Sequence, residues 1–405
     1  MSRRLLPVPT STGADGRPEL KLYVCGITPY DSGHLGHAFT FTSFDVLQRW
    51  VLDSGVAVRY VQNVTDVDDP LFERARRDGV AWEALAEREI GRFSGDMAAL
   101  GARPPDVMPR VSREISTILG AVEGLVASGV TYQSDAVYFD ASRFPSYGAL
   151  SGRSRRSMLA KLRDEGLFGE VGRGHKRDPL DFALWRGSAA DEPAWPSPFG
   201  EGRPGWHIEC SAMSMRYLGP VLDVHGGGRD LAFSHHESER AQSESLTGDV
   251  FARAWLHTGL VRYQGHKMSK SLGNLVVVRQ CLERPGVSAA AVRLCLAGHH
   301  YRSDWEFRWE ALDRAAALAD RVRDLVGEAR GAGAGPGGAG GPDGGGREAA
   351  DPRLVEGFRA AMDADLNTPA AVRVLRAAVR KRDAAAAAWM LGILAGSASL
   401  EPLRD

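Results

Sequence analysis

The sequence lacks the features that mark membrane, secreted and nucleic-acid-binding proteins. Its 405 residues contain no run of 18 apolar residues, so it offers no membrane-spanning helix. Four cysteines are too few for a disulfide framework, and the N-terminus has no apolar signal segment. Lys and Arg (50) almost balance Asp and Glu (51), which leaves little general attraction for a phosphate backbone. We therefore expect a cytoplasmic protein with no membrane partner.

The composition is that of an ordinary globular protein, with 43% apolar and 25% charged residues, and the length suggests two to three domains. Cys281 and Cys295 have apolar neighbours and are expected to be packing residues. Cys25 and Cys210 have polar or glycine-rich neighbours and need another explanation. Residues 331–347 contain ten Gly and two Pro, which predicts a flexible linker.

The first 70 residues predict a βαβ unit. Residues 21–27 and 58–64 are expected to be strands, and residues 34–53 a helix. Such a unit implies a parallel sheet, with a ligand crevice at the carboxyl ends of its strands. The fold class is therefore α/β, with a Rossmann-type nucleotide-binding domain.

The rest of the chain predicts an interrupted nucleotide fold. Residues 71–125 look helical throughout, and short strands with turns follow up to residue 204. The second half is expected to contain a strand at 221–225, then a glycine turn, and residues 288–330 again look helical. The expected domains are 1–70 (first half), 71–204 (insertion), 205–280 (second half), 281–330 (helical stem), 331–347 (linker) and 348–405 (short helical tail).

Residues 34–37 read HLGH and open the first predicted helix directly after a strand. Backbone N–H groups and the helix dipole favour a phosphate at that position. His34 and His37, one turn apart, can hydrogen-bond phosphate oxygens and stabilise charge that develops on the α-phosphate of ATP. We predict that both are catalytic.

Residues 267–271 read KMSKS, in a loop flanked by Ser and Gly. Lys267 and Lys270 can neutralise a departing pyrophosphate as mobile point charges. The order and spacing of the two motifs predict an enzyme that activates a carboxylate with ATP–Mg²⁺.

A candidate metal site combines Cys25, Cys210, His235 and Glu239. His235 and Glu239 are four residues apart and share one helix face. Thiolate, imidazole and carboxylate ligands suit Zn²⁺, which leads us to expect one zinc per chain. A zinc ion would bind a substrate thiolate, whereas a hydroxyl could not compete. This site predicts cysteine as the activated amino acid.

Other motifs have weaker interpretations. Trp206, four residues before Cys210, is either an apolar wall of the pocket or a core residue. The glycines of HGGGRD (225–230) permit close approach of a ligand such as adenosine. In NVTDVDD (63–69), the three aspartates Asp66, Asp68 and Asp69 are expected to be structural or solvated.

The combination of CGITPYD, HLGH, NVTDVDD, GRPGWHIECSAM, DVHGGGRDL, HHESE, KMSKSLGN and GHHYRSD resembles the cysteinyl-tRNA synthetase family over most of residues 20–310. CGITPYDSGHLGHA and YVQNVTDVDDPLFERA are especially similar to the related mycothiol-biosynthesis ligases, which join cysteine through cysteinyl-AMP to the amine of glucosaminyl-inositol. The resemblance implies a class I synthetase (HUP) fold and the four zinc ligands named above. It also implies that the adenylate contacts Cys25, Gly26, Ile27, Thr28, Thr40, Asn63, Val64, Thr65, Trp206, Gly228, Arg229, Asp230 and Val261.

The sequence departs from the ligase pattern in four places. It has Glu239 and His225 where the ligases have other residues, Ser234 where proline is usual, and a different segment at 170–179. Ligation to another small amine, charging of tRNA and a non-catalytic binding role therefore stay open as alternatives. With a short tail and near-neutral charge, we expect small-molecule partners, no tRNA and a monomer.

Overall fold

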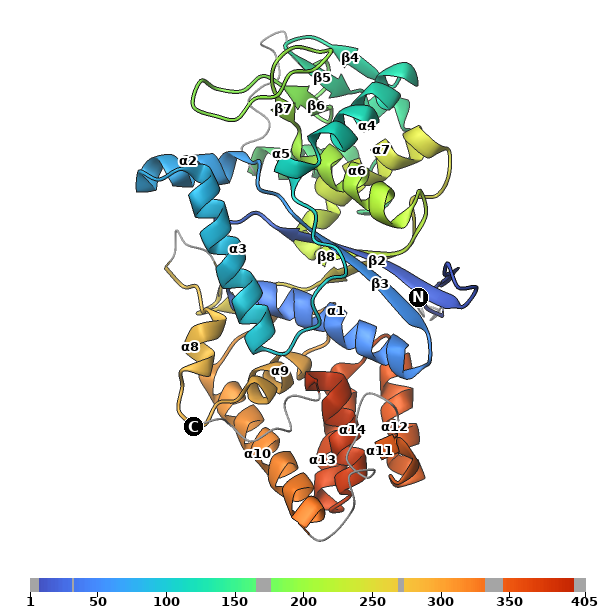
Figure 1. Cartoon of the computed structure of the whole chain (residues 1–405), viewed down its shortest axis with the longest axis vertical. Coiled ribbons are helices and arrows are strands. Elements are labelled where there is room, and N and C mark those ends of the chain that lie inside the picture. The colour runs from blue at the N-terminus through green and yellow to red at the C-terminus, as the bar shows by residue number, and fades with distance from the viewer. Residues whose placement is uncertain (1–6, 31–32, 165–175, 269–272, 332–344, 397–405) are drawn as a thin grey trace.

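A computed structural model of the chain describes residues 7–30, 33–164, 176–268, 273–331 and 345–396. A five-stranded sheet crosses the middle of the molecule (Figure 1) and is parallel except for β1 (Ser11–Thr12), a short antiparallel strand. Its parallel strands lie in the order β3 (Ala57–Val64), β2 (Pro18–Ile27), β8 (Leu222–Gly228) and β9 (Ala252–Thr258). Residues 107–110 run parallel beside β3, where Val64 N donates to Pro109 O at 2.9 Å. This strand order is that of a Rossmann-type domain, as the sequence predicts.

Alternation along β2 decides which helix layer each side chain faces. Leu22 and Val24 pack in the cluster that contains α1 (Leu35–Asp53), whereas Cys25 packs on the other face with Cys210 of α6 (Trp206–Leu218). The predicted strands and first helix therefore agree with the structure to within three residues. The strand pleat is what brings two cysteines 185 positions apart in sequence onto one face of the sheet.

The insertion follows β3; its part from α4 to β7 lies above the sheet in Figure 1, whereas α3 runs down beside the sheet toward α1. An antiparallel sheet connects its four short strands in chain order, from β4 to β7. Its apolar cluster is shared with α6, so it packs directly on the nucleotide-binding domain. The elements are α2 (Asp69–Asp78), α3 (Trp82–Ala99), α4 (Ile115–Ala127), β4 (Thr131–Gln133), β5 (Ala136–Phe139), α5 (Arg155–Asp164), β6 (Phe182–Arg186) and β7 (Arg203–Pro204).

Three details of the predicted elements are wrong. Residues 71–125 are not one helical stretch, because Gly79 and Gly101 adopt positive φ (65° and 66°) and an extended segment follows the second glycine. Residues 288–330 are interrupted by β12 (Trp305–Glu306), which pairs with β10 (Val261–Tyr263). The three glycines at 226–228 are the end of β8, not a turn.

Glycine at 226 is required by packing. A Cβ there would lie 2.2 Å from the Phe44 ring of α1, so only glycine lets this helix pack closely on the sheet. The turn itself is a 3₁₀ segment, Arg229–Ala232, and α7 (His235–Thr247) follows it.

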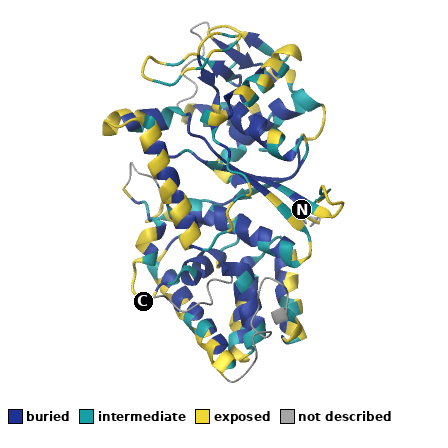
Figure 2. Cartoon of the chain, in the orientation of Figure 1, coloured by how far each residue is buried: buried dark blue, intermediate teal, exposed yellow. Residues whose placement is uncertain are grey.

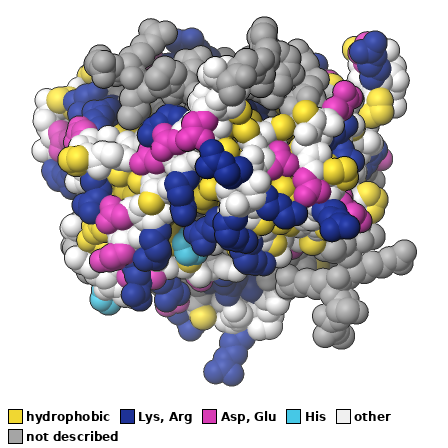
Figure 3. All heavy atoms as spheres, turned by 90° about the horizontal axis from the view of Figure 1, so that it is seen from below, with side chains coloured by type: hydrophobic (Ala, Val, Ile, Leu, Met, Phe, Trp, Pro, Cys, Tyr) yellow, Lys and Arg dark blue, Asp and Glu magenta, His cyan; other side chains and the backbone are white. Residues whose placement is uncertain are grey.

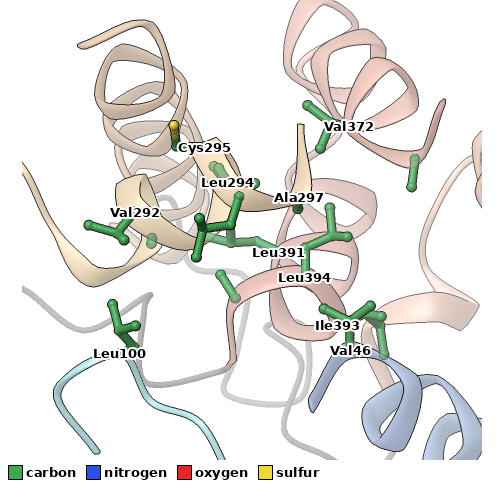
Figure 4. Packing of buried hydrophobic residues seen from close by; sticks show 14 of the residues in the cluster. Val46, Leu100, Val292, Leu294, Cys295, Ala297, Val372, Leu391, Ile393 and Leu394 are labelled. Atoms are coloured by element: carbon green, nitrogen blue, oxygen red, sulfur yellow. The ribbon is translucent and has the colours of Figure 1, made fainter. Parts of the chain in front are cut away.

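The C-terminal helices pack on the nucleotide-binding domain below the sheet (Figure 1). α14 (Ala384–Ala395) is buried almost all round and contacts α9 (Ala289–Ala297) and α1. Figure 4 shows Leu391 and Leu394 of α14 against Leu294 of α9. The remaining elements are β11 (His266–Lys267), α8 (Val278–Leu282), α10 (Trp309–Gly331), α11 (Gly345–Glu348), α12 (Pro352–Asp363) and α13 (Thr368–Arg380).

An ion pair buried in this interface joins Arg293 of α9 to Asp45 of α1. Arg293 also donates to Leu394 O of α14 at 3.1 Å. Cys281 and Cys295 belong to the same apolar cluster, which confirms them as packing residues.

Burial is concentrated in the sheet, α6 and α14, and exposed residues lie on the outer helices (Figure 2). The face seen from below mixes Lys and Arg with Asp and Glu (Figure 3). Arg373, Arg376 and Arg380 of α13 are exposed, and Lys381 forms an ion pair with Asp351 at 2.9 Å. Within the described ranges, no helix is both long and apolar enough to cross a membrane.

Candidate active site

A pocket of about 560 Å³ opens at the carboxyl ends of β2, β3 and β8, where a Rossmann-type sheet binds its ligands. Most of the predicted site residues line it. They are Cys25, Gly26, Ile27, Thr28, His34, His37, Thr40, Asn63, Thr65, Trp206, Cys210, Gly228, Asp230, His235, Val261 and Lys267.

Four predicted residues stand apart from this lining. Val64 is buried in the apolar cluster under α2 and α3. Arg229 forms an ion pair with Asp304 at 2.8 Å, outside the pocket. Glu239 lies behind the lining, and Lys270 lies outside the described residues.

Sequence reasoning missed other lining residues, among them Tyr30, Leu231 and Leu260. Tyr30 is five residues after Cys25 in the CGITPYD motif, a signal that could have identified it. Leu231 ends the DVHGGGRDL motif, but an apolar side chain there has no chemical signature, and Leu260 belongs to no motif.

His34 is both the N-cap of α1 and a pocket residue. Its Nδ1 accepts hydrogen bonds from Gly36 N (3.1 Å) and His37 N (3.3 Å). Nδ1 therefore carries no proton, and the proton of the neutral ring is on Nε2, available to a ligand. A Cβ at Gly36 would lie 2.9 Å from the His34 ring, which explains the glycine between the histidines.

Both histidines of the HLGH motif are held uncharged. Burial and the nearby Lys267 lower the pKa of His34 to about 4, although Asp230 opposes the change. Burial, His34 and Lys267 lower the pKa of His37 well below its usual value. The two rings stack with their centroids 3.8 Å apart. At neutral pH the pair can offer hydrogen bonds to phosphate oxygens, but it adds no positive charge.

The chain segment after KMSKS is fixed to the HLGH motif. Leu35 N donates to Val276 O at 2.8 Å, and Val278 N donates to Gly33 O at 2.9 Å. Lys267 is the first residue of KMSKS, and its Nζ lies 3.0 Å from Asp230 Oδ2. The Lys267 ammonium therefore lies beside the same pocket as the two histidines.

The predicted metal ligands converge as a buried cluster. The ligand atoms of Cys25, Cys210, His235 and Glu239 all lie within 4.8 Å of one another. Glu239 Oε1 is 3.4 Å from Cys25 Sγ and 3.0 Å from His235 Nε2. Burial opposes ionisation of Cys210, but hydrogen bonding from Cys25 and the charge of His235 lower its pKa to about 6.

Further side chains orient this cluster. His207 Nδ1 and His235 Nδ1 are 2.9 Å apart, so Nε2 of His235 is left to face Glu239. The Trp206 ring stacks on His235 with centroids 4.3 Å apart and is 37% exposed. Of the two interpretations of Trp206, the structure supports the pocket wall.

The donor set fits a zinc ion, because two thiols, an imidazole and a carboxylate are brought together in a buried place. A second set, which the sequence reasoning missed, combines Cys25 and Glu239 with His225 and His236. Glu239 lies between the two sets, with Oε2 3.1 Å from His225 Nε2. The adjacent histidines His235 and His236 are the sequence feature that could have indicated this second set.

The fold and this site define a class I aminoacyl-tRNA-synthetase-type enzyme. The family described as tRNA synthetases class I (C) catalytic domain matches residues 14–317. The chain belongs to the family of L-cysteine:1D-myo-inositol 2-amino-2-deoxy-α-D-glucopyranoside ligases. It is 51% identical to the member from Acidothermus cellulolyticus over 332 residues, which cover 82% of this chain and 80% of that protein.

Two other similar proteins place the chain within the wider class. It is 45% identical to the cysteine–tRNA ligase of Pelobacter propionicus over 368 residues, 89% of this chain and 73% of that protein. The Mycobacterium tuberculosis methionyl-tRNA synthetase in complex with methionyl-adenylate superposes with a TM-score of 0.64, 17% identity and coverage of 93% and 88%. The predicted family and fold class are confirmed.

Proposed function

We propose that this chain uses ATP to activate cysteine as cysteinyl-AMP and transfers the cysteinyl group to the amine of 1D-myo-inositol 2-amino-2-deoxy-α-D-glucopyranoside. The observation that carries the proposal is the 51% identity, over 82% of the chain, to a relative named for this ligation. The pocket agrees with it, because thiol-binding groups lie in the same pocket as groups suited to phosphates.

Cysteine is proposed to bind next to Cys25, Cys210, His235 and Glu239. These residues would hold the zinc ion, which supplies a soft Lewis acid for the substrate thiolate and so discriminates against serine. Trp206, stacked on His235, covers the site and restricts the size of the amino acid.

Adenylation is proposed to depend on His34, His37 and Lys267. The cysteine carboxylate attacks the α-phosphate, and pyrophosphate leaves as its Mg²⁺ complex. Nε2–H of His34 donates a hydrogen bond to the phosphate, where charge develops in the transition state. Lys267 exchanges Asp230 for the departing pyrophosphate, and we assign the same role to Lys270. Thr28, Thr40, Asn63 and Gly228 are proposed to position the adenylate.

Charging of tRNA is a second candidate, favoured by the 45% identity to a cysteine–tRNA ligase and by the presence of Glu239. One experiment separates the candidates. Cysteine-dependent ATP–pyrophosphate exchange should occur without tRNA and should be far weaker with serine. Purified enzyme is then supplied with glucosaminyl-inositol, other amines or tRNA. Equal exchange with serine and with cysteine would refute the activation step. If the enzyme forms cysteinyl-tRNA but no product with glucosaminyl-inositol, the amine acceptor is refuted.

A further inference from the structure

Two carboxyl groups near the pocket form no ion pair with any described residue. Thr28 lines the pocket, and its Oγ1 donates to Asp68 Oδ2 at 3.3 Å. The other oxygen of Asp68 accepts from Asp69 N at 2.9 Å, which caps α2. In the part of the chain that the structure describes, no Lys, Arg or His forms an ion pair with Asp68.

Glu209 is the second carboxyl group, on α6 between Trp206 and the metal-site Cys210. Its side chain is fully buried, yet neither oxygen has a hydrogen-bond partner among the described residues. Burial raises the pKa of Glu209 well above its usual value, and the charge of Asp68 raises it further against the charge of Arg203, so the two carboxyl groups lie within electrostatic range of each other. A buried polar group without a partner costs free energy, which a ligand with N–H donors would recover.

The arginines that bind the adjacent Asp69 are already ion-paired. Arg186 and Arg203 both bind Asp69, and Arg203 also binds Glu192 at 3.0 Å. The charge of Arg203 reaches both Asp68 and Glu209, but among the described residues no cationic side chain forms an ion pair with either of them. Asp66, by contrast, accepts hydrogen bonds from both Ser112 N and Ser112 Oγ and has a structural role, as the sequence predicts.

We propose that Asp68, with Thr28 and Glu209, forms the subsite that binds the ammonium group of the acceptor, and that Asp68 takes the proton which this group must lose before it attacks cysteinyl-AMP. This inference rests on the proposed function and names a group for which sequence reasoning gave no candidate. The sequence predicts that Asp68 is structural or solvated, and this role would replace that prediction.

Amide formation requires the acceptor to lose two protons and cysteinyl-AMP to lose AMP. The acceptor R–NH₃⁺ gives one proton to the Asp68 carboxylate and becomes R–NH₂. Its nitrogen forms a bond to the carbonyl carbon of cysteinyl-AMP, the bond from that carbon to the phosphate oxygen breaks, and AMP leaves. The second proton of the attacking nitrogen goes to water or to the AMP phosphate. An acceptor that is already uncharged needs no such base.

The surroundings of Asp68 suit a proton acceptor near neutral pH. Burial and the charge of Asp69 raise its pKa to about 6, against the hydrogen bonds from Asp69 N and Thr28 and the charge of Arg203. The charge of Asp68 in turn contributes to the raised pKa values of Tyr30 and Glu209, after burial in both cases. A general base is most effective when its pKa lies close to the operating pH.

The test uses Asp68→Asn, because asparagine is as good an N-cap as aspartate and should keep α2 intact. Cysteine-dependent ATP–pyrophosphate exchange should change by less than about 2-fold. Transfer from preformed cysteinyl-AMP to glucosaminyl-inositol, measured in a single turnover at pH 7, should fall by about 100-fold or more, the usual contribution of a general base. Transfer to hydroxylamine, which is largely uncharged at that pH, should be retained.

Two further variants distinguish catalysis from structure. Asp69→Asn removes a negative neighbour, so it should move the acidic limb of the wild-type transfer rate to lower pH without reducing the plateau. Glu209→Gln should raise the KM for the amine and leave the zinc content unchanged. If Asp68→Asn loses exchange as much as transfer, or transfers to protonated amines at the wild-type rate, the proposal is wrong.

The identity of the acceptor is tested independently of the role of Asp68. If wild-type protein forms cysteinyl-AMP but makes no amide with glucosaminyl-inositol, the proposed function fails. In that case the rate of cysteinyl transfer is measured in wild type and in Asp68→Asn, with glucosamine and with hydroxylamine as acceptors. An equal loss of transfer rate with both acceptors would overturn the role of Asp68.

Discussion

His34 serves two purposes that two substitutions can separate. Its Nδ1 caps α1 by accepting from Gly36 N and His37 N, while Nε2–H is free for the phosphate. His34→Ala removes both, and His34→Asn restores a good cap without restoring the phosphate donor. The two variants should therefore differ in stability and agree in activity.

The magnitudes follow from the two kinds of hydrogen bond. Loss of the cap in His34→Ala should lower the free energy of unfolding by about 1 kcal/mol, whereas His34→Asn should be within a few tenths of wild type. Both variants should lose about 100- to 1,000-fold in the rate of exchange, because one preorganised donor to the transition state is missing.

The assay is cysteine-dependent ATP–pyrophosphate exchange at saturating substrates, with thermal or urea unfolding on the same preparations. His37→Asn is the matched comparison, since His37 does not cap the helix. Wild-type exchange in His34→Asn would refute the phosphate role. A stability loss in His34→Asn equal to that in His34→Ala would refute the capping role.

Three other predictions rest on the same structure. Lys267→Ala should slow exchange far more than it raises the KM for cysteine, and unchanged exchange would remove the lysine from the mechanism. Cys210→Ala should bind much less than one zinc per chain by metal analysis, whereas Cys281→Ala, in the apolar core, should retain it; equal zinc contents would refute the assigned site. Acidification from pH 6.5 to 4 should destabilise the protein, because the folded state lowers the pKa of His34 to about 4 and the unfolded chain then binds more protons. His34→Asn should show a smaller loss over that range, and an unchanged pH dependence of unfolding would contradict the shift.

The sequence predicts the site better than it predicts the connections around it. Cys25, His34 and Lys267 can be assigned because a strand end, a helix start and a basic loop each have a local signature. His225 and Glu209 have none, because they matter through Glu239 of α7 and through Asp68 at the start of α2, which folding alone brings near them.

The same limit applies to the fold. The break after Gly101 depends on a segment that pairs with β3, and the helical appearance of residues 71–125 gives no sign of this pairing. The tail is predicted as short helices, but not where they dock, since docking depends on Arg293 meeting both Asp45 and Leu394 O.

α14 has a consequence for how the chain can be handled. A helix with apolar residues on every side cannot remain in water by itself, and the surface that α9 and α1 present to it would be equally unsuited to solvent. The C-terminal helices are thus an internal ligand of the nucleotide-binding domain, held at high effective concentration because both are parts of one chain. A chain cut within residues 332–344 should still purify as one particle, and a chain shortened before α14 should aggregate.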